Sequence, residues 1–281
     1  MRDVLDVTVA ELAKAAKRPA LWVLLAVAIV LSQVFNYLIP YLAYRTGDTP
    51  PVGGTARDLL PSMLPEQAVG STISGFPVFA GALALVFGAL ITGSEFGWDT
   101  VKTQLIQRPG RLAVLAGQWL TILVGVLVGV AAMLAFSAVS STAIAAIEDA
   151  SLGWGSAGEV VAGAAAGALI LLMWAGLGAG LGMLLRGVAM PIGLGVVWVL
   201  GVENLVSVMA STAFTALQPV RDVLPGINAG SLVVSVAGAA TEGTPGVTDS
   251  VDGLRAVVTV CCYLAAAVIV AMIAMRRRDV T

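Results

Sequence analysis

Charged side chains gather in the segment GSEFGWDTVKTQLIQRPGR, residues 93–111, although only 11% of this chain is charged. Its acids come first and its bases last, the order that a helix dipole favours. Trp98, Val101 and Leu105 recur at spacings of three and four, which gives the segment one apolar face. A Pro-Gly pair then ends the helix. We predict a short amphipathic helix over 95–111, and two interpretations are open: it transmits force from a partner to the two flanking spans, or it is an interfacial segment whose Trp98 anchors at the lipid head groups.

Reactive groups are scarce in the rest of the sequence. The chain has no histidine, which excludes histidine-dependent nucleophiles and HExxH zinc sites. Lysine occurs only at positions 14, 17 and 102, and none belongs to a phosphate-binding P-loop. Cys261 and Cys262 are adjacent in an apolar stretch and have no metal or redox spacing. We therefore predict no catalytic residue, no metal site and no cofactor in this chain, and the net charge of −2 predicts no nucleic-acid partner.

Glu203 is the one acid inside a long apolar stretch. An acid within a membrane span is costly and often functional. Two explanations are open: Glu203 lies in a transport path, or it lies at the outer end of its span, near water. The second is slightly favoured. A carrier usually needs more than one such group, and an intramembrane aspartyl enzyme would need a second acid, which the sequence does not offer.

Long charge-free stretches set the architecture. A helix needs about 20 apolar residues to cross a bilayer, and the mean hydropathy of +0.96 is far above that of soluble domains. We predict an all-α, polytopic membrane protein forming a single domain over 1–281, with six transmembrane helices at 19–44, 75–94, 112–145, 158–186, 188–210 and 254–275.

Basic residues set the expected orientation. Most of the 15 lysines and arginines fall at the N-terminus, in 95–111, at Arg186 and at the C-terminus. Because cytoplasmic loops are enriched in Lys and Arg, both termini are expected in the cytoplasm.

Three further segments complete the predicted layout. Leu5, Val9, Leu12 and Ala16 form an apolar stripe opposite Asp3, Asp6, Lys14 and Lys17, so residues 1–18 are expected to form an interfacial amphipathic helix. Residues 45–66 contain many Gly and Pro and predict an outer loop. The region 211–250 is broken by prolines and predicts short re-entrant helices in an outer hairpin. Small-xxx-small spacings, such as Gly178/Gly182, predict close helix packing.

The segment between spans two and three resembles a motif of type-2 permeases of ATP-binding-cassette (ABC) exporters. The resemblance rests on the order Glu95, Trp98, Thr100, Lys102, Leu105, Pro109 and Arg111. It extends to the N-terminal amphipathic helix, to Glu203 and to DVLPGINAGSLV, which is similar to the family's segment between spans five and six. Two positions depart from the pattern: Asp99 replaces a frequent Gly, and Gln118 replaces a frequent Lys.

The resemblance implies a permease subunit that exports a hydrophobic or amphipathic substrate, such as a drug, lipid or peptide, across the plasma membrane. A separate nucleotide-binding subunit would bind ATP and magnesium, and the permease would pair with a second copy or a similar permease among membrane lipids. The residues implied to couple to the ATPase are Glu95, Phe96, Trp98, Asp99, Thr100, Lys102, Leu105 and Arg108. Glu203, Pro225 and Asn228 are implied to line a transport path or gate. The alternatives are an ion-gradient-driven secondary carrier and a membrane subunit that transports nothing.

Overall fold

The computed structural model describes residues 2–47, 59–97, 110–212, 214–238, 241 and 244–277, and these residues are almost entirely helical. Six helices are long and apolar enough to cross a membrane, which confirms the predicted all-α architecture with six candidate spans. They cover Pro19–Thr46, Phe76–Glu95, Leu112–Ile147, Ala157–Leu185, Ala189–Ala210 and Gly253–Met275.

Three spans are single α-helices, and three contain a π-helical segment. The uninterrupted helices are α8 (Arg111–Ile147), α9 (Ala157–Leu185) and α14 (Gly253–Arg277). Span one consists of α2 (Pro19–Gln33), η1 (Val34–Leu38) and α3 (Ile39–Thr46). Span two consists of η4 (Phe76–Ala80) and α6 (Gly81–Gly97), and span five of α10 (Ala189–Val197), η5 (Trp198–Val202) and α11 (Glu203–Thr212). Periodicity in the sequence gave no sign of these wider turns.

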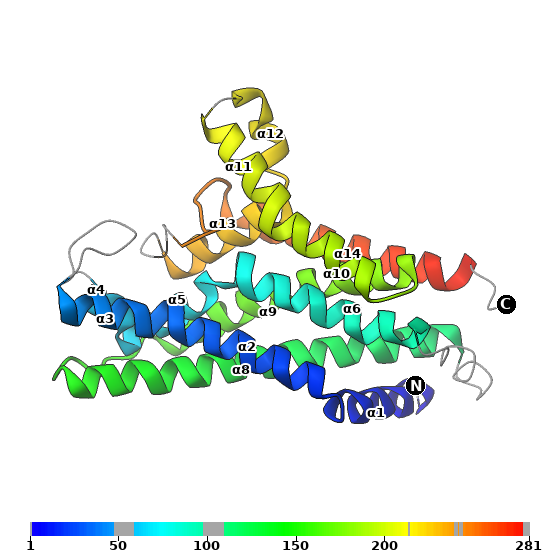
Figure 1. Ribbon diagram of the computed structural model, residues 1–281, viewed down its shortest axis with the longest axis horizontal. Helices are drawn as coiled ribbons and strands as arrows, with labels where there is room; N and C mark the ends of the chain where they lie inside the picture. The colour runs from blue at the N-terminus through cyan, green and yellow to red at the C-terminus, as the bar shows by residue number, and fades with distance from the viewer. Residues whose placement is uncertain are drawn as a thin grey trace.

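The two ends of the bundle contain different helices (Figure 1). The N-terminal helix α1 (Arg2–Ala16), the end of α6, the start of α8 and the end of α14 lie at one end. Helix α3 and the short helices α4 (Leu59–Met63) and α5 (Ala68–Ser74) lie at the opposite end. Helices α11 and α12 (Gln218–Arg221) extend away from the rest of the bundle.

The predicted outer loop over 45–66 is wrong in part. Helix α3 continues through Thr46, and residues 59–67 form α4 and a 3₁₀ turn at Pro65–Gln67. Proline fits the first turn of a helix because its fixed φ suits that position and no hydrogen bond from its nitrogen is needed there. Pro65 starts its 3₁₀ turn in this way.

Helix α9 forms the centre of the bundle and lies between α6 and α14. A Cβ added at Gly178 would lie 2.0 Å from the carbonyl oxygen of Leu85 on α6, and one added at Gly180 would lie 3.3 Å from that of Ala267 on α14. Trp174 of the same helix is fully buried. The small-residue spacings in α9 therefore serve packing within one chain, because glycine lets two helix backbones approach closely.

Helix α1 leaves part of its apolar stripe exposed and turns Val7, Thr8 and Glu11 toward the bundle, whereas Asp6 and Lys17 of the predicted polar side are exposed. Leu5 and Val9 are exposed, whereas Thr8 and Glu11 are buried. Arg18 precedes α2, and Pro19 is the first residue of that helix, as the sequence predicted. The exposed apolar residues agree with a helix lying on a membrane surface, and the buried polar residues require partners within the protein.

Helix α13 (Pro225–Ala237) lies in the region predicted to hold re-entrant helices. Its residues from Pro225 to Val233 are all buried, so neighbouring helices cover its backbone. Ser231 fixes the chain that returns toward α14: its hydroxyl donates to the carbonyl of Thr248 at 2.8 Å and accepts from the amide of Val251 at 3.3 Å.

We predict that Gly178→Ala destabilises the protein by about 1–3 kcal/mol, because the new methyl group would overlap the backbone of α6. Gly193→Ala is the matched control, since nothing lies within 4 Å of a Cβ at that position. Thermal unfolding of the purified protein in detergent should show a lower midpoint for the first variant only. Equal midpoints for the two variants would contradict this packing.

Candidate functional site

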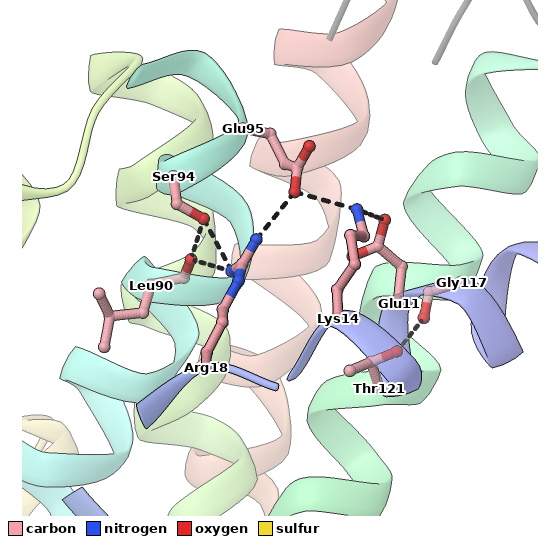
Figure 2. Close-up of polar contacts among 8 residues, drawn as sticks. All are labelled: Glu11, Lys14, Arg18, Leu90, Ser94, Glu95, Gly117 and Thr121. Atoms are coloured by element: carbon pink, nitrogen blue, oxygen red, sulfur yellow. Dashed lines mark hydrogen bonds and ion pairs between the residues drawn. The ribbon is translucent and has the colours of Figure 1, made fainter. Parts of the chain in front are cut away.

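Glu95 is a buried acid in the last turns of α6, where the predicted coupling segment 95–111 begins; because α6 continues through Gly97, this start of the segment belongs to the helix of span two. Its side chain is only 3% exposed. Its carboxylate lies 3.0 Å from the ammonium of Lys14 and 3.1 Å from the guanidinium of Arg18 (Figure 2). Both bases belong to the N-terminal region, so ion pairs connect parts of the chain that are far apart in sequence.

Arg18 also binds the backbone and side chains of α6. Its guanidinium donates to the carbonyl of Leu90 at 3.3 Å and to the hydroxyl of Ser94 at 2.9 Å. Lys14 pairs with two acids, because its ammonium also lies 2.5 Å from the carboxylate of Glu11 on its own helix. Two acids and two bases thus balance each other in a site where Glu11 and Glu95 are nearly inaccessible to water. We call Glu11, Lys14, Arg18 and Glu95 the charge cluster.

Close packing of α1 on α8 complements the charge cluster. A Cβ at Gly117 would lie 2.4 Å from a methyl group of Val7, so α1 can approach α8 closely only at a glycine. Thr121 donates to the carbonyl of Gly117 at 2.9 Å and thereby satisfies its own hydroxyl within α8 (Figure 2). Ion pairs to Glu95 therefore attach α1 to span two, and close packing at Gly117 attaches it to span three.

Only part of the predicted coupling site falls within the described residues. Glu95 is the member whose contacts are seen, and Phe96 belongs to the last turn of α6. Trp98, Asp99, Thr100, Lys102, Leu105 and Arg108 lie outside the described residues. The sequence did not identify Glu11, Lys14 and Arg18 as partners of Glu95, because nothing in local spacing links residues about 80 positions apart.

Glu203 forms a second polar site, within span five. The expectation that it lies near water at the end of its helix is wrong, because the residue is only 6% exposed and α11 continues to Thr212. Its carboxylate accepts from the indole nitrogen of Trp198 at 2.7 Å and from the amide of Gly226 at 2.9 Å. These donors make burial tolerable, since a buried carboxylate needs hydrogen bonds to replace water.

The structure brings the three residues of the predicted gate into one region. Pro225 is at the start of α13, and Glu203 accepts from the next amide, so it caps that helix from another span. Asn228, one turn later, donates to the carbonyls of Asp222 at 3.0 Å and Leu224 at 2.8 Å. The arrangement ties the start of α13 to span five. It does not by itself reveal a transport path.

A third polar group joins spans one and three at the end of the bundle opposite α1. Glu148 accepts from Tyr41 at 2.7 Å and Tyr44 at 3.3 Å and lies 3.2 Å from Arg45. The hydrogen bond from Tyr41 is the largest influence on the Glu148 carboxyl and holds its pKa below the ordinary value. The carboxylate is therefore charged at neutral pH and keeps the two helices together.

In the described part of the chain, no group of three His, Cys, Asp or Glu side chains lies close enough together to hold a metal ion. No protein-family model and no curated protein sequence matches the chain.

We predict that Arg18→Gln loosens α1, because it removes one ion pair and two hydrogen bonds to α6. The cost should be about 2 kcal/mol, less than for a fully broken buried pair because Lys14 still neutralises Glu95. Hydrogen–deuterium exchange of the backbone amides of α1 should quicken by roughly 30-fold. Lys17→Gln, which alters an exposed neighbour, should leave exchange unchanged. Equal exchange in both variants would show that the cluster does not hold α1.

A second expectation concerns the cap on α13. Glu203→Leu leaves the amide of Gly226 without its acceptor in a buried setting, which should cost about 1–3 kcal/mol. Glu203→Gln keeps a side-chain oxygen that can accept this hydrogen bond and should cost less. Thermal midpoints in detergent provide the test, with Asn204→Leu as the control because Asn204 donates only to carbonyls of its own span. If Gln and Leu at position 203 are equally harmful, Glu203 is more than a cap.

Proposed function

We propose that this chain is the transmembrane permease subunit of an ABC exporter, which moves a hydrophobic or amphipathic substrate outward with ATP hydrolysed by a separate subunit. The observation that supports this most is the charge cluster beside the predicted coupling segment. It attaches α1 to the end of α6 through Glu95, the first residue of the segment whose sequence resembles the family motif.

The cluster suggests how force would reach the membrane. A push on residues 95–108 by a closing ATPase dimer would be received at the end of α6. Because Lys14 and Arg18 bind Glu95, α1 would move with α6. Because α1 packs on Gly117, the start of α8 would move too. Contact with the ATPase at this one segment could therefore displace spans two and three together, because α1 connects them.

The spans differ sharply in how much of their surface the rest of the protein covers, and this difference supports the proposed transmission of force. Within the searched windows, spans two and four are 67% and 56% buried, whereas spans one and five are 11% and 17% buried. Spans two and four would act as the rigid part of the permease. The less covered spans would face lipid or a second permease and could change their contacts at lower cost.

A secondary carrier is the second candidate, and the burial of Glu203 is the observation that favours it. Proton carriers use buried acids. Here, however, the carboxylate accepts hydrogen bonds from Trp198 and Gly226, which gives it a structural task as a helix cap. If the chain is a secondary carrier, it should transport substrate without any ATPase. If it is an exporter permease, it should transport no substrate without one.

The proposal places the protein in the plasma membrane with both termini in the cytoplasm, as the distribution of Lys and Arg suggests. It requires no cofactor in this chain, since ATP and magnesium would be bound by the partner subunit. A second permease copy or a similar permease would complete the transporter.

The decisive experiment is purification of the tagged chain from its native membranes, with mass spectrometry of the proteins that remain bound. We expect a P-loop ATPase whose hydrolysis depends on the permease. Trp98→Asp or Leu105→Asp places a charge on the apolar face of the predicted helix and should weaken the complex at least about tenfold.

Gln107→Asp is the control for this experiment, because helical spacing places it opposite Trp98 on the predicted helix. Its complex should persist. Full complex formation by the Trp98 and Leu105 variants would refute the coupling assignment, and transport of substrate without an ATPase would refute the exporter.

A further inference from the structure

An unusual group of polar side chains lies between spans one and three. Ser32, Gln33, Asn36 and Tyr37 on span one, with Ser137 and Ser140 on span three, form what we call the polar stripe. Gln33 is midway between Pro19 and Thr46, which places it about 20 Å from either end of span one, whereas Ser137 and Ser140 lie ten and seven residues before the end of span three at Ile147.

Most groups in the polar stripe pair with one another. Ser140 donates to the side-chain oxygen of Gln33 at 2.5 Å, and Asn36 donates to Ser32 at 3.2 Å. Tyr37 and Ser137 share a short hydrogen bond, and Ser137 also donates to the carbonyl of Ala68 at 3.0 Å. Such bonds stabilise helix pairs in lipid.

One group in the polar stripe has no partner among the described residues. The side-chain amide nitrogen of Gln33 is inaccessible to water and makes no hydrogen bond there. A buried donor without an acceptor is costly, so a sequence selected only for helix packing would favour an apolar residue at this position. The unmet donor would be satisfied by an oxygen atom that enters between the two spans.

The surface around the polar stripe suggests what would bring that oxygen. Val30, Phe35 and Leu38 on the same span are each more than half exposed, so apolar surface borders the polar groups. Span one is wider here, because residues 34–38 form a π-helical turn, a feature often found at functional sites. Toward the end of the bundle opposite α1, the polar groups continue to Tyr41, Glu148 and the exposed Arg45.

We propose that the polar stripe binds the head group of a glycerophospholipid-like amphiphile while its acyl chains lie on the exposed apolar surface of span one. The head group would contribute ester or phosphate oxygens, which accept hydrogen bonds from Gln33 and its neighbours. Polar groups at Gln33, at Tyr37 with Ser137, and at Tyr41 with Glu148 recur toward the end of the bundle and would lower the cost of moving such a head group through hydrocarbon. The binding site stands alone, and its use for export rests on the proposed function.

The test places the full chain, without an ATPase, in vesicles of phosphatidylethanolamine and phosphatidylglycerol. Two photoactivatable phospholipids are compared, one with a diazirine in its head group and one with a diazirine at the end of an acyl chain. Mass spectrometry maps the attached peptides. We expect head-group attachment to concentrate on residues 32–37 and 137–140, and acyl-chain attachment to spread over the apolar surface.

The double variant Gln33→Leu with Asn36→Leu should reduce head-group attachment at the stripe about tenfold, given the hydrogen bonds removed. Asn204→Leu, on another lightly covered span, should not change it. Attachment that is uniform along span one, the same for both probes, or unchanged in the double variant would overturn the proposal and leave the polar stripe as a helix contact.

The comparison of the two probes in the unaltered protein needs no variant, so poor folding of the double variant would not rescue a failed proposal. Failure here would also leave the exporter untouched. Conversely, the absence of any ATPase partner would remove the export step without affecting the attachment pattern.

Discussion

The burial of the Glu95 carboxylate at the end of a membrane helix is the constraint on which the rest of the arrangement depends. A charge in such a place must be neutralised nearby, because its loss of hydration costs several kcal/mol. Lys14 and Arg18 supply the opposite charge, and both precede the first span. Helix α1 is therefore held against the bundle, with Glu11 inward and Leu5 and Val9 outward. If the acid at position 95 were exposed to water, it would not need ion pairs with Lys14 and Arg18, and α1 would lose this contact with the bundle.

Close backbone contacts perform a comparable task within the membrane, where hydrophobic burial gives little preference for one helix arrangement over another. Glycine in α9 meets the backbone of α6, and glycine in α8 admits α1. The contact of Gly178 fixes depth and rotation because the backbone of α6 cannot move aside as a flexible side chain can, whereas Gly117 makes room mainly for the side chain of Val7. The rigid centre of the molecule thus follows from small residues at a few positions, and the charge cluster connects that centre to the surface helix.

The sequence was sufficient for some features and insufficient for others, for physical reasons. Spans are visible in the sequence because each is a long apolar run, and Pro19 as the first residue of span one follows from its fixed backbone geometry. The partners of Glu95 were not predictable, since local periodicity carries no information about contacts between distant segments. Glu203 was misplaced for the same reason: the donors that allow its burial come partly from Gly226, in a different helix. The π-helical turns and the helical part of 59–66 were missed because each depends on packing rather than on pattern.

The three polar groups of the bundle occupy different positions, and this separates their physical roles. The charge cluster and the Glu148 group join span one or its preceding helix to neighbours at opposite ends, where charged groups are closest to water. The polar stripe lies between them, where hydrogen bonds are neutral and one donor is unmet. Spans one and three are therefore joined by the Glu148 group at one end and by the polar stripe, whereas Lys14 and Arg18 bind span two. Entry of a head group would require the two spans to separate locally at the polar stripe, while the Glu148 group keeps them joined at that end.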